Sequence, residues 1–162
     1  MYGPYELCET WRLMILDAMT AAARPTISTS YAGVGLIAWD DICGQLVVAP
    51  ERIYRSSIFP TEDSSIEQCY AGTIAVTLVC SLVRCVPTLD NNGRAPSAGS
   101  LAAAHKSVLD DAAVIWRAVN LPVLDDEQER ALVAQDFVGG EGGAIAIETR
   151  WTIGVESSLW CE

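Results

Sequence analysis

The chain is poor in positive charge. Ten lysine and arginine residues stand against 21 aspartate and glutamate residues, so the formal net charge at pH 7 is −11. The cations are scattered, and none of their clusters is longer than Arg52 to Arg55. Because tight nucleic-acid binding depends on lysine and arginine that neutralise phosphates, we expect no strong affinity for DNA or RNA. The acidic balance favours solubility, and it is compatible with a place beside DNA that the protein does not hold.

Long apolar runs are also missing. The longest uncharged run, roughly Cys69 to Val83, is shorter than the about 20 residues that a membrane-spanning helix needs. No lysine or arginine precedes Arg12, and Glu6 and Glu9 interrupt the N-terminal segment, which argues against a signal peptide. With 162 residues, 51% of them apolar and 19% charged, the chain suits one globular domain with its own core. We therefore expect a soluble intracellular protein that does not enter a membrane.

The sequence carries no standard signature of catalysis or of cofactor binding. It has no GxSxG, GxGxxG or GxxxxGK[ST] motif. The single His105 lies on an apolar helical stripe without an accompanying nucleophile or carboxylate pattern, which is typical of a packed core or rim histidine. The GGEGG stretch lacks the lysine and the following helix of a phosphate-binding loop. We predict no catalytic, metal-binding or cofactor-binding residue, and no cofactor.

Paired aspartates are the nearest approach to a metal site. They are Asp40–Asp41, Asp110–Asp111 and Asp125–Asp126. Adjacent residues of a strand point to opposite faces, so such a pair offers one carboxylate to a given site, and no DxD motif or histidine completes an oxygen-rich site. The helical pair Asp110–Asp111 is interpreted as part of a solvated face. The stretch WDDICGQL, with a tryptophan that can bury its ring and Gly44 at a bend, is interpreted as the entry to a strand.

The six cysteines do not form an obvious framework. Cys8 falls in a helical pattern, and Cys80 and Cys85 fall in a strand. Without a secretory signal, the default interpretation is that they are buried thiols that pack as small apolar groups. Zinc binding is the alternative, but the sequence has no CxxC pair and His105 is distant from every cysteine. A Cys43–Cys69 disulfide is compatible with the sequence, which gives no ground for choosing it.

Two helices are expected from apolar residues at helical spacing. The first covers about 5–24, and its stripe is Leu7, Trp11, Met14, Ile15, Ala18 and Ala22. Pro25 ends it, and 26–35 is expected to be a loop. The second covers about 97–119 and is capped by Ser97. Its expected apolar stripe is Leu101, His105, Val108, Leu109, Ala112, Ile115, Trp116 and Val119.

Strands are expected at about 45–56 and 72–86 and in a hairpin at about 131–156. Pro50 cannot donate a ladder hydrogen bond, so it predicts an edge position or a bulge in the first strand. The segment 72–86 is apolar on both faces, which is typical of a central strand. The residues from Ala144 to Glu156 alternate, and GGEGG precedes them as a hairpin tip. The order predicts a single α+β domain over 1–162, with an antiparallel sheet flanked by two main helices.

Three stretches of the chain carry a resemblance. They are AWDDICGQLVVAPERIYRS, GTIAVTLVCSLVRCVP and PSAGSLAAAHKSVLDDAAVIWRAV. They resemble head-to-tail connector proteins of the tailed phages of mycobacteria and related actinobacteria. Within that group, the order of elements is similar to that of the tail terminators of long-tailed phages. The resemblance covers roughly Gly35 to Val155.

The resemblance implies a structural virion protein without catalytic residues. Such a subunit forms a ring, a hexamer in this family, that caps the tube of major tail protein, stops its polymerisation and meets the stopper or connector proteins of the neck. Genomic DNA passes through the lumen without specific binding. The protein would be assembled in the cytoplasm of the bacterial host and end in the virion neck. A head–tail stopper or another head-completion connector is the alternative within this group.

Two stretches are the expected contact surfaces of such a subunit. They are the loop from Pro60 to Glu67, with Pro60, Glu62 and Asp63, and the hairpin tip of Gly139, Gly140, Glu141, Gly142 and Gly143. Two other classes of function stay open. A small cytosolic enzyme would lose its activity on replacement of His105 or Asp40, and a monomeric ligand-binding module would have a well-formed apolar pocket.

Overall fold

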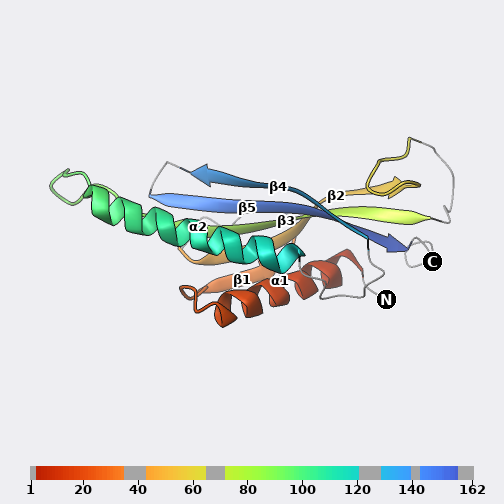
Figure 1. The fold of residues 1–162 in the computed structure, drawn as a ribbon, viewed down its shortest axis with the longest axis horizontal. Helices are drawn as coiled ribbons and strands as arrows, with labels where there is room; N and C mark the ends of the chain where they lie inside the picture. The colour runs from red at the N-terminus through yellow and green to blue at the C-terminus, as the bar shows by residue number, and fades with distance from the viewer. Residues whose placement is uncertain (1–2, 35–42, 65–71, 121–128, 140–142, 157–162) are drawn as a thin grey trace.

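The computed structural model describes residues 3–34, 43–64, 72–120, 129–139 and 143–156 (Figure 1). Two helices and five strands follow one another along the chain. They are α1 (Pro4–Ala21), β1 (Thr29–Ala32), β2 (Gln45–Ser56), β3 (Thr73–Cys85), α2 (Ala98–Asn120), β4 (Arg130–Gly139) and β5 (Ala144–Glu156). The fold is therefore α+β, as the sequence predicts.

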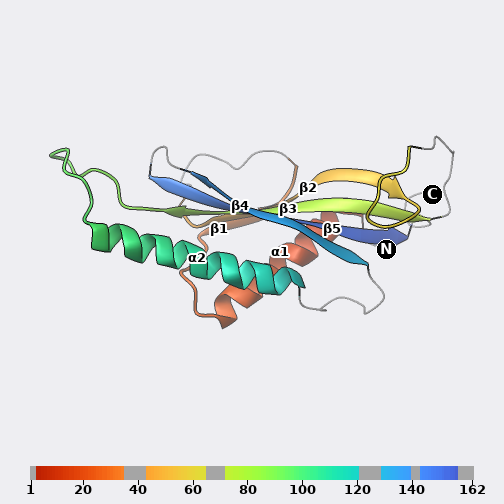
Figure 2. The same cartoon turned by 45° about the horizontal axis from the view of Figure 1, so that its top comes forward.

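The strands form one sheet in the order β1-β2-β3-β5-β4. Both helices lie on the same side of this sheet, as Figure 2 shows, so the molecule has two layers. The pairs β2–β3, β3–β5 and β4–β5 are antiparallel, as predicted. The pair β1–β2 is parallel, so the prediction of a wholly antiparallel sheet is wrong at this edge.

The strand β1 falls in the segment 26–35 that is predicted to be a loop, so that prediction is also wrong. Its four residues, TSYA, are too few to produce an alternating apolar pattern. The strand forms because Gly44 offers its carbonyl to the amides of Ser28 and Thr29, at 2.8 and 3.4 Å, and because β1 then continues alongside β2. The strand conformation of this segment therefore depends on pairing with residues that are distant in the sequence and not on its local sequence pattern.

The long strand β3 occupies the centre of the sheet, as its two apolar faces predict. It pairs along its whole length with β5, from Thr73 opposite Glu156 to Cys85 opposite Ala144. On its other side it pairs with β2, whose register shifts between Pro50 and Arg52. The bulge predicted from Pro50 is confirmed, because the missing amide hydrogen cannot take part in a regular ladder.

The core lies between the sheet and the helices. Its centre is the contact of Trp11 on α1 with Trp151 on β5, whose ring centroids lie 5.2 Å apart at an angle of 59°. Both side chains are fully buried. Around them pack the helix-facing residues of β2, β3 and β5, which include Val48, Leu78 and Ile153. Truncating either buried tryptophan would leave a large cavity between α1 and the sheet. The contact of the two rings therefore sets how α1 packs on the sheet.

The second helix buries only part of the predicted apolar stripe, namely Val108, Ala112, Ile115 and Val119. Its buried residues are Val108, Asp111, Ala112, Ile115, Ala118 and Val119. His105, Leu109 and Trp116, predicted on the apolar stripe, are exposed instead. No residue from Ala98 to Ser107 is buried, and this end of α2 projects beyond the strands in both views (Figures 1 and 2).

Candidate functional surfaces

A buried ionic cluster joins the two helices to the sheet. Asp111 on α2 has no exposed side-chain surface, and it accepts hydrogen bonds from Arg24 Nε at 2.5 Å and from Arg84 Nε on β3 at 2.7 Å. Arg84 also donates to the carbonyl oxygens of Pro25 and Thr26, at 2.8 and 3.1 Å. The cluster therefore holds the chain that leaves α1 against β3 and α2.

Asp111 contradicts the prediction that the pair Asp110–Asp111 forms a solvated face. On a helix, adjacent residues are turned by about 100° from each other, so one member of a pair can be buried while the other is exposed. Asp110 is the exposed member, and it pairs with Lys106 at 2.7 Å and with Arg24 at 3.6 Å. The hydrogen bond from Lys106 lowers the pKa of the Asp110 carboxyl. All these groups are engaged with one another, which suits a structural brace.

Sequence reasoning missed this cluster although the sequence contains a signal for it. Arg84 interrupts the otherwise apolar stretch SLVRC at a position that shares the helix-facing side with Cys80 and Leu82. A cation at a core position needs a buried anion, and Asp111 meets that need. The partner could not be chosen among 21 acidic residues without the packing of α2 on the sheet.

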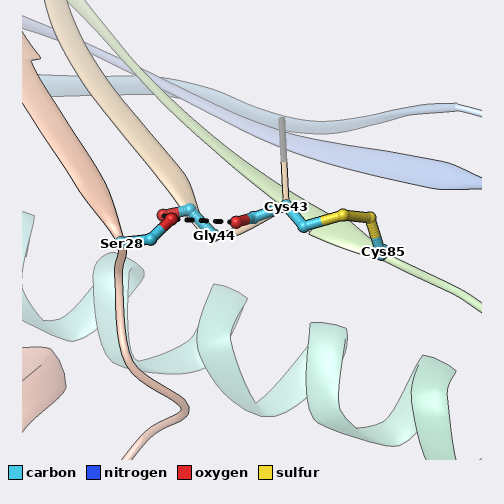
Figure 3. The surroundings of a disulfide bond; sticks show 4 residues. All are labelled: Ser28, Cys43, Gly44 and Cys85. Carbon is cyan, nitrogen blue, oxygen red and sulfur yellow. Dashed lines mark hydrogen bonds between the residues drawn. A yellow bond between two sulfur atoms is a disulfide. The ribbon is translucent and has the colours of Figure 1, made fainter. Parts of the chain in front are cut away.

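Cys43 and Cys85 form a disulfide with a Cα–Cα distance of 5.2 Å. The pair continues the ladder of β2 and β3, in which Gln45 lies opposite Val83 and the amide of Gly44 donates to the Val83 carbonyl. Figure 3 shows the bond beside Ser28, whose hydroxyl donates to the Cys43 carbonyl at 3.0 Å. The default interpretation of six unpaired thiols is therefore wrong for these two residues.

The alternative pairing Cys43–Cys69 is contradicted, because Cys43 has Cys85 as its partner; Cys69 itself lies outside the described residues. Cys8 and Cys80 are buried free thiols, as predicted. Burial raises the pKa of Cys8 to about 11 and that of Cys80 to about 12. Both thiols are therefore protonated at neutral pH and unsuited to nucleophilic chemistry.

The predicted contact loop, Pro60 to Glu67, is described as far as Ser64, and residues 65–67 lie outside the described residues. Its described part, with the preceding residues 57–59, folds back on β2. Asp63 donates its amide to the Arg55 carbonyl at 2.8 Å, and its carboxylate accepts from the Ser57 hydroxyl at 2.7 Å. Pro60 follows a cis peptide bond, and its carbonyl accepts from the Tyr54 hydroxyl at 2.8 Å. Glu62 forms an ion pair with Arg52. The loop is thus ordered by its own strand and presents the exposed side chain of Ile58 outward.

The predicted glycine tip is described at its two ends only. Gly139 ends β4 opposite Ile145, and Gly143 begins the return with a φ of +77°. The Gly143 carbonyl accepts from the Val86 amide at 2.7 Å. Gly140, Glu141 and Gly142 lie outside the described residues. The tip is therefore anchored to the chain that leaves β3.

The two predicted surfaces do not form one site. The glycine tip lies at the end of the sheet where Cys85 meets Ala144, and the loop 57–64 follows the end where Ser56 meets Thr73. The 13 residues of β3 separate these ends, a length of about 40 Å at the rise of a β-strand. The two predicted contact surfaces therefore lie at opposite ends of the sheet.

The sheet face away from the helices carries a second charged group. Arg150 on β5 donates to Glu51 on β2 at 3.1 Å, to Asp136 on β4 at 2.9 Å and to Glu148 at 2.7 Å. The hydrogen bond to Glu51, followed by that to Glu148, raises the pKa of the Arg150 guanidinium. One cation thus links three strands and leaves this group with a formal charge of −2.

Apolar side chains are exposed along the two edges of the sheet. Phe137 and Val138, near the end of β4, are 50% and 52% exposed. At the opposite edge, Val34 follows β1 and is 85% exposed. In the described part of the chain, no strand pairs with the outer side of β4 or of β1. Both edges are therefore able to receive a further strand.

The remaining candidates for chemistry are dispersed. His105 is exposed on α2, and the pairs Asp40–Asp41 and Asp125–Asp126 lie outside the described residues. Within the described ranges, no three histidine, cysteine or acidic side chains gather as they would around a metal ion. A shallow cavity of about 330 Å³ lies beside the end of α1 and is lined by Thr20, Arg24 and Ile27, among others. None of the helices that the structure describes has the length and apolar character of a membrane span.

No protein family model matches this chain, and no curated protein matches it.

Proposed function

We propose that the protein is a subunit of a phage neck ring that terminates the tail tube and joins it to the head connector. The observation that carries this proposal is the separation of the loop 57–64 and the glycine tip 139–143 to opposite ends of the sheet. A terminator has to contact the tube on one side and the neck on the other. Two surfaces about 40 Å apart on one sheet suit that task.

The sheet edges suit a ring of identical subunits. β1 is parallel to its neighbour β2, and β4 points in the same direction as β3, which is antiparallel to β2. The two outermost strands of the sheet, β1 and β4, are therefore antiparallel to each other. If subunits stand side by side with their strands along the ring axis, β4 of one copy meets β1 of the next in antiparallel orientation. Exposed Phe137 and Val138 would then lie level with Ser30 and Thr29 of the neighbour, because the register across the sheet puts these residues at the same height. This contact joins two different surfaces, as a cyclic ring requires.

The charge balance agrees with a passage for DNA. A wall with net negative charge offers phosphates few cationic partners and so does not retain them. The carboxylates around Arg150 add to this charge on the sheet face that the helices leave uncovered. With the strands along the ring axis, the uncovered sheet face can line the lumen, while the two sheet ends point to the tube and to the neck.

Disruption of the gene in its phage tests the proposal, with the particles viewed by electron microscopy. Overlong tails without filled heads support a terminator. Tails of normal length beside heads that have lost their DNA would assign the protein to a head–tail stopper instead. Intact virions would refute a role in the neck.

Complementation of that disruption tests the ring contact. Phe137→Asp places a charge on the β4 edge and should fail to restore tails of normal length, because a buried unpaired carboxylate opposes the subunit contact. Leu109→Asp is the matched control, since Leu109 is similarly exposed, at 56%, but lies on α2. Equal complementation by both variants would refute the proposed edge contact.

A further inference from the structure

We propose that the Cys43–Cys85 disulfide is a site of reversible thiol–disulfide exchange, and that its reduction releases β1 from the edge of the sheet. Both cysteines are exposed to solvent, whereas the free thiols of Cys8 and Cys80 are buried. A dissolved dithiol can therefore reach this bond without unfolding the core.

The exchange is balanced between the protein and a dithiol. The thiolate of the reductant attacks one sulfur of the Cys43–Cys85 bond, which breaks as a mixed disulfide forms. The second thiol of the reductant then displaces the bound cysteine. Two electrons and two protons pass to the protein, which gains two thiols, while the dithiol becomes a disulfide. An oxidised dithiol drives the same steps in reverse.

The residue next to each cysteine anchors the connection between α1 and β1. Gly44, which follows Cys43, accepts the amides of Ser28 and Thr29 with its carbonyl oxygen. Arg84, which precedes Cys85, donates to the carbonyls of Pro25 and Thr26. The disulfide thus ties together the two points from which the segment 25–29 is held.

The backbone at Gly44 is closely fitted to this connection. Its φ of +80° lies in the left-handed region, and an added Cβ would lie 3.2 Å from the Thr26 carbonyl oxygen and 3.4 Å from the Ser28 nitrogen. The hydrogen bonds to Ser28 and Thr29 therefore form only if Gly44 stays close to this position. Without the disulfide, Gly44 is at the end of the β2–β3 ladder, where strands fray most readily.

The strand β1 is only four residues long, and Ala32 at its end packs against the core. Four residues pair with β2, the Gly33 amide donates to the Val48 carbonyl at 3.1 Å, and Arg12 on α1 donates to the Ser30 hydroxyl at 2.7 Å. Its release would uncover the outer edge of Gln45–Val48, which is an apolar strand able to pair with another chain. Oxidation or reduction of the Cys43–Cys85 bond therefore controls whether β1 covers the outer edge of β2.

Hydrogen exchange followed by mass spectrometry tests the proposal on the full chain, with dithiothreitol as the reductant. Reduction should speed exchange of the Ser28, Thr29 and Gly33 amides by about tenfold or more, because local opening becomes easier. Amides in the centre of β3 and β5 should be unchanged. No change at residues 28–33, or an equal change over the whole sheet, would overturn the proposal.

A C43S/C85S variant provides the matched control. Without reductant it should exchange like the reduced protein, and dithiothreitol should not affect it further. A response of this variant to dithiothreitol would come from other cysteines and would refute the assignment. If the variant does not fold, stepwise reduction of the natural protein supplies the same readout. A non-reducing peptide map that lacks the Cys43–Cys85 cross-link would also overturn the proposal.

Discussion

Two guanidinium groups converge on the buried carboxylate of Asp111. Removing one partner from a buried charge network costs more than the network contributes net, because the remaining charges stay buried without compensation. Arg84 is held among apolar strand residues and cannot turn to solvent without disturbing its bonds to Pro25 and Thr26. At the scale of single residues, this carboxylate is the most sensitive polar position described.

We expect Asp111→Asn to lower the free energy of unfolding by about 3–5 kcal/mol, as observed when buried ion pairs lose one partner. Urea unfolding measured at neutral pH gives this value. Asp110→Asn is the control, since the neighbouring carboxylate is exposed and should have a much smaller effect. Similar losses for the two variants would contradict the structural role given to Asp111.

Gly44 offers a second residue-scale prediction. Gly44→Ala should destabilise the protein by about 1–2 kcal/mol through its positive φ, with a further loss from contact with the Thr26 carbonyl. Gly93→Ala separates the two effects, because Gly93 has a φ of +75° and nothing within 4 Å of an added Cβ. The melting temperature should therefore be lower for Gly44→Ala than for Gly93→Ala. The reverse order would contradict the close fit at Gly44.

At the scale of elements, helices and long strands followed from the sequence because each carries its own periodic signal. Thus α1, β3 and the β4–β5 hairpin lie where expected, within a few residues. The four-residue β1 has no such signal and depends on Gly44, which lies 11 residues beyond Gly33 in the chain. The face of α2 was predicted in part, since Val108, Ala112, Ile115 and Val119 are buried as expected. Leu109 and Trp116 fit the same helical stripe but are exposed, while Asp111 is buried between two arginines.

The Glu9–Arg12 ion pair on α1 gives a pH dependence. Arg12 Nε donates to Glu9 at 2.7 Å, and this hydrogen bond lowers the pKa of the Glu9 carboxyl from its usual 4.5. A lowered pKa in the folded state stabilises the protein above the unfolded value. That stabilisation is lost as the pH falls through the lowered pKa. The relevant window is therefore below about pH 4.5.

We expect the natural protein to lose more stability than Glu9→Gln when the pH is lowered from 6 to 3. The difference should be no more than about 1 kcal/mol, because the pair is partly exposed and screened by solvent. Urea unfolding at a series of pH values measures it. Parallel pH profiles for the two proteins would show that the Glu9–Arg12 pair contributes nothing.

At the scale of the whole molecule, the sequence indicated the two proposed contact stretches but not where they lie on the sheet. Acids and hydroxyls marked the stretch from Pro60 to Glu67, and glycines marked the tip 139–143, but the position of the two at opposite ends depends on the antiparallel register of β2, β3 and β5. The disulfide depends on the same register, since Cys43 and Cys85 are 42 residues apart in sequence. Spacing alone cannot supply such a pairing, because it does not reveal which residues face each other across a ladder.

The net charge predicts weak binding to DNA. With 21 acidic and 10 basic residues, the surface offers phosphates few partners, and little counterion release is available to drive association. We expect fluorescence anisotropy with duplex DNA at physiological salt to give a Kd weaker than about 1 μM, as non-specific binding does. Binding at micromolar affinity or tighter would contradict the proposal that DNA passes through the ring without being bound by its wall.

The Cys43–Cys85 bond also changes what a break in the chain would mean. The bond closes a covalent ring of the chain that contains β2, the connection after it and β3. Residues 57–64 are part of this ring. A protease that cut there would open the covalent ring but leave every part of the molecule connected. The nicked protein should therefore run as one species in a non-reducing gel and as two fragments after reduction. A single unchanged band under both conditions would mean that the loop resists cleavage.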